Sequence, residues 1–202
     1  MENLRRSQFG GLFTGMRSTP VRDQHAFVWK NKFEMKQSFR VELQKEYLTF
    51  SAAHFITFAG SICERLHGHN YRVRCVIEGP LDENQYVIDF IALRDSLKKI
   101  VDELDHRMLL PTSHPLIRVQ PASSADTGEE MVVTFEDRRW VFPAGDCILL
   151  PVENTTAELV ARYIGERLLA ALDLKTKGYS ALEMGIDENQ GQWGICRFDL
   201  TQ

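Results

Sequence analysis

The stretch SFRVELQKEYLTFSAAHF (residues 38–55) is the first part of the chain with a sustained structural pattern. Phe39, Val41 and Leu43 alternate with polar residues, and the segment then continues with residues that favour extended backbone. A second stretch, NYRVRCVIEG (70–79), alternates in the same way and is followed by a proline that ends it. Two alternating segments this close in sequence predict a pair of antiparallel strands.

Two later segments change from strand to helical periodicity. VIDFIALRDSLKKIVDELDH (87–106) contains Asp89 as a favourable N-cap, and ENTTAELVARYIGERLLAAL (153–172) offers Thr155 or Thr156 for the same role. Each segment carries apolar residues at the spacing of one helix face. The residues expected to be buried are Leu93, Leu97, Ile100, Val101 and Leu104 in the first helix and Leu159, Val160, Tyr163, Ile164 and Leu168 in the second.

Two further strands are expected near the end of the chain. They occupy YSALEMGI (179–186) and GQWGICRF (191–198), and an Asp-Glu-Asn-Gln-Gly turn joins them. Between the helices, residues 112–150 start as a loop and then contain a hairpin that pairs Met131–Phe135 with Trp140–Phe142. The order β-β-α-hairpin-α-β-β predicts an α+β fold with an antiparallel sheet.

The domain organisation follows from where these patterns begin. Residues 1–35 mix glycine, arginine, serine and proline without a period, which indicates an N-terminal extension. Residues 36–202 are expected to form a single domain, with an insertion at about 112–150.

Composition excludes several classes of protein. A net charge of −4 argues against nonspecific nucleic-acid binding, which needs a basic surface. No apolar run approaches the length of about 20 residues that a membrane-spanning helix requires. Four widely spaced cysteines without a CxxC pair favour reduced thiols. We therefore expect a cytoplasmic protein that binds neither nucleic acid nor membrane.

The stretch CERLHGHNY (63–71) carries the strongest chemical signal. His67 and His69 are two apart, so in a strand both imidazoles point to the same face. His54 ends the preceding expected strand, and pairing of the two strands would bring it alongside them. Three neutral imidazoles suit Zn²⁺ and leave a fourth coordination position open. The alternative is a chance histidine pair in an exposed turn.

Cys63 and the pair Asp105–His106 are candidates for further chemistry. Cys63 could be a zinc ligand, a reactive thiol favoured as thiolate by nearby positive charge, or a small buried apolar residue. A carboxylate next to a histidine, as in Asp105–His106, can orient the ring for general acid–base catalysis, although such pairs also end solvated helices. Cys75, Cys147 and Cys196 are expected to be buried apolar residues.

Taken together, these motifs resemble the 6-pyruvoyltetrahydropterin synthase and 6-carboxytetrahydropterin synthase family. Six motifs occur in order between residues 38 and 198, which makes the resemblance specific; residues 1–35 fall outside it, and the insertion is longer than the family's usual loop. The motifs are FSAAH, CERLHGHNY, VIDF, ELDHRML, NTTAELVARYI and the glutamate of ALEMGI. The resemblance implies a tunnelling fold, in which a four-stranded antiparallel sheet carries two helices on one face and the subunits close a barrel as a trimer or hexamer.

The resemblance also implies roles for individual residues. His54, His67 and His69 would bind Zn²⁺, and Cys63, Asp105 and His106 would be catalytic. Glu183 would anchor the pterin ring, with Thr156 and Glu158 as further substrate contacts. Here the family's Thr-Thr-Glu pattern reads Thr-Ala-Glu, so that contact is less complete.

The implied substrate is 7,8-dihydroneopterin triphosphate, and the reaction remains to be chosen. Three residues separate Cys63 from His67, as in family members that form 6-carboxy-5,6,7,8-tetrahydropterin on the way to queuosine. We favour this zinc-dependent lyase activity over the pyruvoyl-forming reaction. Glu64 introduces a rival, because a subgroup with glutamate near this position cleaves the dihydroneopterin side chain toward folate; a solvated loop residue is the simpler interpretation. A non-catalytic pterin-binding scaffold is less favoured.

Overall fold

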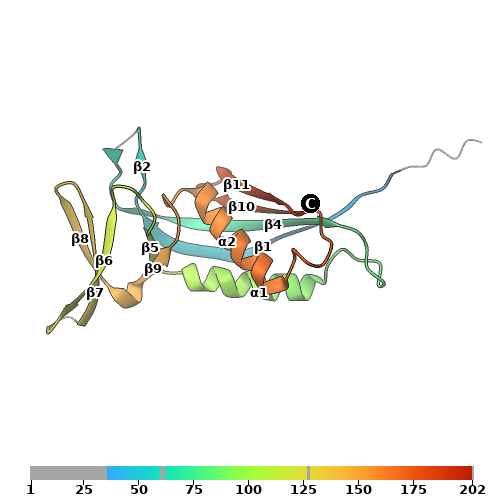
Figure 1. The fold of residues 1–202 in the computed structure, drawn as a ribbon, viewed down its shortest axis with the longest axis horizontal. Coiled ribbons are helices and arrows are strands. Elements are labelled where there is room, and N and C mark those ends of the chain that lie inside the picture. Colours follow the sequence, from blue (N-terminus) through green and yellow to red (C-terminus); the bar gives the residue numbers. More distant parts are fainter. Residues whose placement is uncertain (1–35, 60–61, 127, 202) are drawn as a thin grey trace, which may run out of the picture. The chain divides into compact units, whose positions relative to one another are not determined.

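The computed structural model describes residues 36–59, 62–126 and 128–201, and residues 37–202 form one compact unit. The expected extension, residues 1–35, lies outside the described residues. Figure 1 shows the arrangement of the elements. The strands and helices are β1 (Phe39–His54), β2 (Thr57–Phe58), β3 (Ile62–Cys63), β4 (His67–Gly79), α1 (Phe90–Leu104), β5 (Arg107–Pro111), β6 (Arg118–Ser124), β7 (Gly128–Phe135), β8 (Arg138–Pro143), η1 (Ala144–Asp146), β9 (Cys147–Leu150), α2 (Ala157–Leu172), β10 (Ala181–Asp187) and β11 (Trp193–Asp199).

The main sheet contains the four predicted strands and two more. Its order is β11-β10-β4-β1-β5-β9, in which the first four strands are antiparallel neighbours, as predicted. The short strands β5 and β9 continue the sheet in parallel, beginning at the end of β1 that carries Ala52 and Ala53. The four-strand count was therefore too low, and the sheet is mixed. β5 directly precedes the insertion and β9 ends it, and their few residues carry too little pattern to be read as strands.

A large bulge in β1 determines which face its second half presents. Gln44 pairs with Arg74 and Thr49 with Arg72, so the pairs are five positions apart on β1 but two apart on β4. The excess of three residues is odd, and it reverses the alternation of side chains along β1. As a result Leu43 and His54 face the same side of the sheet although one number is odd and the other even.

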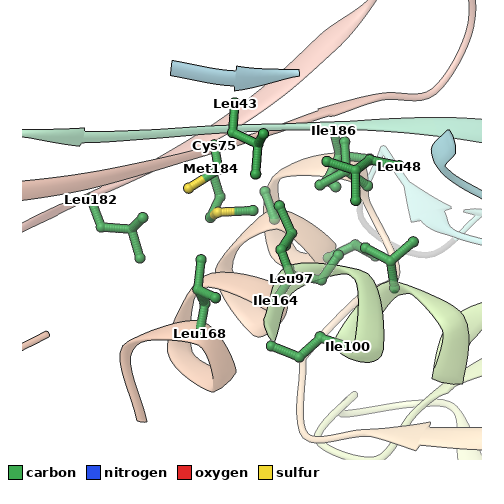
Figure 2. Packing of buried hydrophobic residues seen from close by; sticks show 14 of the residues in the cluster. Leu43, Leu48, Cys75, Leu97, Ile100, Ile164, Leu168, Leu182, Met184 and Ile186 are labelled. Atoms are coloured by element: carbon green, nitrogen blue, oxygen red, sulfur yellow. The ribbon is translucent and has the colours of Figure 1, made fainter. Parts of the chain in front are cut away.

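Both helices cover this side of the sheet. Leu43, Cys75 and Met184 lie opposite one another on three neighbouring strands and contribute to one hydrophobic core with α1 and α2 (Figure 2). All five residues predicted to be buried in α1 are buried. In α2 the prediction holds for Val160, Ile164 and Leu168, whereas Leu159 and Tyr163 are only partly buried.

The helix starts agree with their sequence signals. The Asp89 side chain accepts hydrogen bonds from the backbone N–H groups of Ile91 and Ala92, which caps α1 as predicted. Of the two threonines proposed to cap α2, Thr156 accepts the bond from the Leu159 N–H. Thr155 is fully buried, and its hydroxyl donates to the Phe55 carbonyl at 3.1 Å.

The insertion has more structure than the sequence predicted. The expected hairpin is confirmed, with Met131 opposite Phe142 and Val133 opposite Trp140 in β7 and β8. The segment expected to be a loop contributes β6, so that β6-β7-β8 form a separate three-stranded sheet. A second hydrophobic cluster packs this sheet against Phe55 and β5. The insertion thus packs against Phe55, the residue that directly follows His54.

Two remaining expectations concern cysteines and membranes. All four cysteines are free thiols, but only Cys75 is fully buried, whereas Cys147 and Cys196 are partly exposed. None of the helices in the described ranges has both the length and the apolar character that a membrane span needs.

Candidate metal centre and active site

Three histidines converge where β1 ends and β4 begins. His54 lies opposite His67 in the β1–β4 ladder, and His69 lies two residues farther along β4, so the three side chains share one face. Each offers a ring nitrogen, and these atoms all lie within 4.8 Å of one another. The cluster predicted from strand alternation is therefore present in the folded chain.

Backbone carbonyls orient two of these rings. His54 Nδ1 lies 2.9 Å from the Thr155 carbonyl oxygen, and His67 Nδ1 lies 2.8 Å from the Arg65 carbonyl oxygen. A carbonyl only accepts, so each Nδ1 carries the proton and each Nε2 presents a lone pair. Burial lowers the pKa of His54 to about 4, which keeps this ring neutral near pH 7.

The donor set fits a divalent metal ion. His54 Nε2 and His67 Nε2 are 3.2 Å apart, and two lone pairs at that distance repel unless a proton or a cation lies between them. Neutral imidazole nitrogens held by second-layer carbonyls are the ligands that Zn²⁺ prefers. Zn²⁺ is therefore compatible with the geometry and the protonation of these residues.

Glu188 and Tyr71 complete the surroundings of the histidines, and neither was predicted from the sequence. Glu188 Oε1 lies 3.5 Å from His54 Nε2 and 3.8 Å from His69 Nε2. The Tyr71 hydroxyl lies 3.2 Å from His54 Nε2, and burial followed by the Glu188 charge raises the pKa of Tyr71. The available signal was an acidic residue directly after a strand, in a segment interpreted only as a turn.

The loop before β4 places Glu64, rather than Cys63, next to a histidine. A Glu64 carboxylate oxygen lies 3.9 Å from His67 Nε2. The partly buried Cys63 side chain packs against the second hydrophobic cluster. Burial raises the pKa of this thiol, and Glu64 and Glu136 act in the same direction, while Arg138 opposes them. The thiol is therefore mainly protonated at neutral pH.

Asp105 and His106 form the predicted pair, which within the described part of the chain is not bonded to the three histidines. Asp105 Oδ2 lies 2.9 Å from His106 Nδ1, and its Oδ1 accepts a bond from the Ser51 N–H at 2.8 Å, which is the main reason that the pKa of Asp105 is lowered. His106 is 82% exposed and has a left-handed φ of 56°. It lines a pocket of about 530 Å³ that also reaches His69. Across the described ranges, no hydrogen bond or ion pair joins the Asp105–His106 pair to the three histidines.

The residues expected to contact a pterin are distributed along other elements. Glu183 lies in the middle of β10 and accepts a hydrogen bond from Arg74 at 3.1 Å. It precedes Glu188 by five residues, or about 16 Å of extended strand. Thr156 is the N-cap of α2, and Glu158 is exposed in the first turn of that helix. The chain by itself does not bring Glu183 to the histidines.

Comparisons with known proteins give a consistent result. The family model described as 6-pyruvoyl tetrahydropterin synthase matches residues 42–198. A protein of Methanocaldococcus jannaschii assigned as a 6-carboxy-5,6,7,8-tetrahydropterin synthase is 34% identical over 153 residues, which cover 74% of this chain and 88% of the relative. The range matched by the family model includes all three histidines and both helices.

Solved structures resemble this fold as well. The 6-pyruvoyl tetrahydropterin synthase of Plasmodium falciparum is 30% identical and superposes with a TM-score of 0.74, covering 81% of this chain and 99% of the other. The Plasmodium vivax enzyme, in a variant whose catalytic glutamate is replaced by alanine, is 29% identical with a TM-score of 0.72 and the same coverage. The similarity thus extends over the whole length of these enzymes.

Proposed function

The chain belongs to the 6-pyruvoyl tetrahydropterin synthase family, and from this premise we propose that it is a zinc-dependent lyase forming 6-carboxy-5,6,7,8-tetrahydropterin. The reaction would convert 7,8-dihydroneopterin triphosphate and water to that product, acetaldehyde and triphosphate, a step toward queuosine. The observation that carries the proposal is the convergence of three imidazoles beside the loop of Cys63 and Glu64. The name of the Methanocaldococcus jannaschii relative supports the carboxy-forming reaction over the pyruvoyl-forming one.

His54, His67 and His69 would hold the zinc ion. When bound, Zn²⁺ would supply a Lewis acid for the side-chain oxygens of the dihydropterin and would acidify the adjacent C–H and O–H bonds. The carbonyls of Thr155 and Arg65 fix the rings of His54 and His67 through Nδ1, so that Nε2 of each would be the ligand atom. Neutral rings bind without first losing a proton, so the low pKa of His54 favours occupancy at neutral pH.

Cys63, Asp105 and His106 would move protons between the substrate side chain and the ring. Burial raises the pKa of the Cys63 thiol, which suits this group to donate a proton first and to accept one later. His106 is exposed, and Asp105 orients its ring through Nδ1. Nε2 of His106 would then be the atom that exchanges protons with the substrate.

An oligomer would explain how the remaining residues take part. We propose a tunnelling-fold assembly, a trimer or hexamer, in which active sites lie between subunits. Glu183, Thr156 and Glu158 would bind the pterin ring. Glu183 would contact the ring of a substrate whose side chain is held at the histidines of a neighbouring subunit. This arrangement accounts for the separation of Glu183 and His106 from the histidines within one chain.

A second activity, cleavage of the dihydroneopterin side chain to a hydroxymethyl product, is favoured by one observation. The Glu64 carboxylate lies 3.9 Å from His67 Nε2, whereas the Cys63 side chain packs against the second hydrophobic cluster. A catalytic glutamate is named in the similar Plasmodium vivax enzyme. Glu64 could therefore act as the base for this cleavage while Cys63 serves the carboxy-forming route.

Product analysis with purified, zinc-loaded protein tests both activities. Incubation with 7,8-dihydroneopterin triphosphate should give the carboxy product and acetaldehyde. Cys63→Ala should abolish the formation of these two products while leaving the zinc content unchanged. Glu64→Gln should remove only a hydroxymethyl product. Zinc loss in Cys63→Ala would make the thiol a ligand, and unchanged substrate with full zinc loading would favour a binding scaffold.

A further inference from the structure

One arginine of the insertion reaches back to the loop of the candidate active site. Arg138 stands at the start of β8, in the hairpin between the two helices of the fold. Its Nη1 donates to the Cys63 carbonyl at 2.7 Å and to the Glu64 carbonyl at 3.0 Å. Charged donors make the stronger hydrogen bonds found in proteins. A single side chain thus binds two consecutive peptide groups next to the histidines.

Arg138 is itself held in place by aromatic packing. Its guanidinium carbon lies 4.6 Å from the centre of the Trp140 ring, on the same strand. The Trp140 ring stacks on Phe55 with centroids 4.7 Å apart and planes inclined by 17°. Phe55 is fully buried and directly follows His54. The stack therefore links the arginine to the end of the strand that supplies a proposed metal ligand.

The opposite side of the loop is tied down by backbone pairing. Cys63 lies opposite Thr57 in the short β2–β3 ladder, and the Glu64 N–H donates to the Ile56 carbonyl at 2.9 Å. With Arg138 on the carbonyl side, the peptide groups of Cys63 and Glu64 have hydrogen-bond partners on both edges. The Cys63 thiol also donates to the Glu64 carbonyl at 3.5 Å, so this carbonyl is held by two donors.

We propose that Arg138 is a positioning residue that fixes the Cys63–Glu64 backbone for the reaction, so that the 112–150 insertion belongs to the catalytic apparatus. The inference rests on the proposed function for its kinetic readout. Arg138 acts through main-chain carbonyls rather than on the substrate. Its loss should therefore lower kcat and leave KM nearly unchanged.

Three variants test the proposal. Arg138→Gln removes the charge and the Nη1 group that donates to both carbonyls. We expect kcat to fall by about tenfold or more while KM changes by less than about twofold. Arg138→Lys keeps the charge and multiple donors, and it should recover part of the lost kcat. Arg139→Gln is the matched control, because Arg139 is the exposed neighbour on the same strand. A raised KM at unchanged kcat would instead assign Arg138 to triphosphate binding and overturn the proposal.

A substrate-free measurement separates this inference from the proposed activity. Amide hydrogen exchange in a peptide covering residues 62–68 should be faster in Arg138→Gln than in wild type, because the loop loses one of its two anchored edges. Arg138→Lys should exchange at an intermediate rate and Arg139→Gln at the wild-type rate. If Arg138→Gln does not fold, the lysine variant alone still decides between the outcomes. Unchanged exchange and unchanged kcat in the arginine variants would refute the proposal, whereas altered exchange in a chain without turnover would refute only the proposed reaction.

Discussion

Glu183 lies within β10 and Glu188 directly follows this strand, yet their surroundings assign them different roles. The Glu188 carboxylate faces the ring nitrogens of His54 and His69, whereas Glu183 faces the Arg74 guanidinium. We expect Glu188→Gln to weaken zinc binding by about tenfold, because it removes a negative charge from the layer around the ligands. Glu183→Gln should leave zinc affinity unchanged and raise KM.

Competition with a chelating dye, followed by steady-state kinetics on each variant, distinguishes the two glutamates. If Glu188→Gln raises KM at full zinc occupancy while Glu183→Gln has no effect, Glu188 rather than Glu183 binds the pterin ring.

His114 is a second residue whose environment has a measurable consequence. It is buried, its Nδ1 accepts bonds from the Leu116 and Ile117 N–H groups, and its Nε2 lies 2.8 Å from the Thr57 hydroxyl. Burial lowers the pKa of His114 below its ordinary value of 6.5. The unfolded chain therefore binds more protons in the range just below pH 6.5, and folding stability falls as the pH decreases through that range.

The contribution of His114 is measured by difference. Urea unfolding of wild type and His114→Asn at pH 7.5 and at several lower values should give a smaller loss of stability for the variant, whose amide accepts hydrogen bonds but does not titrate. Equal pH slopes for the two proteins would show that His114 does not contribute.

At the scale of single residues, sequence reasoning found the histidines but not their acidic neighbour. Two-residue spacing and strand alternation are local properties, so His67 and His69 could be placed on one face without knowing the fold. Glu188 reaches them only because β10 pairs with β4 in a register that sets Asp187 opposite Arg72. That register is a long-range property with no local signal.

Among the elements, β1 shows why the position of His54 could not be derived from alternation alone. Counting by twos from Leu43 places His54 on the opposite face of an uninterrupted strand. The excess of three residues between Gln44 and Thr49 corrects this mismatch. The exposed sequence Lys45–Tyr47 carries no local signal of a bulge. The three-histidine cluster was therefore predicted correctly, but the bulge that turns His54 to the right face was not.

This bulge leads to a test by deletion. Removing residues 45–47 takes away three exposed residues and should leave His54 opposite His67. Without these residues β1 has no excess over β4, and regular alternation already places His54 on the same face as Leu43. Removing Ser51 alone, in the regularly paired part of β1, turns either His54 or the segment with Leu48 and Phe50 to the wrong face. We expect zinc stoichiometry near wild type in the three-residue deletion and loss of zinc in the one-residue deletion.

Elemental analysis of both deletion variants, with circular dichroism as the folding control, makes the comparison. Retention of zinc by a folded one-residue deletion would mean that β1 can shift its register without cost.

For the whole molecule, the strongly patterned parts were predictable and the parts that depend on distant pairing were not. The four predicted strands of the main sheet, both helices and the hairpin of the insertion carry alternation, a 3.6-residue period or caps, and all are present. The short parallel strands β5 and β9 and the third strand of the insertion have only four to seven residues each. Their existence depends on the partner strands available in the folded chain, which a local pattern does not encode.

The separation of catalytic candidates within one chain leads to a prediction about the assembled protein. His106 is 82% exposed, and across the described residues neither it nor Asp105 bonds to the three histidines or to Cys63. If sites form between copies, each pairs Cys63 of one chain with His106 of another.

A Cys63→Ala chain and a His106→Ala chain should each be inactive alone, but their mixed oligomers should regain activity in about a quarter of the sites by random pairing. Activity measured after subunit exchange, with exchange verified by native mass spectrometry, checks this expectation. Fully exchanged oligomers that stay inactive would place both residues in the site of a single chain, and the lone subunit would then have to bring His106 to its own histidines.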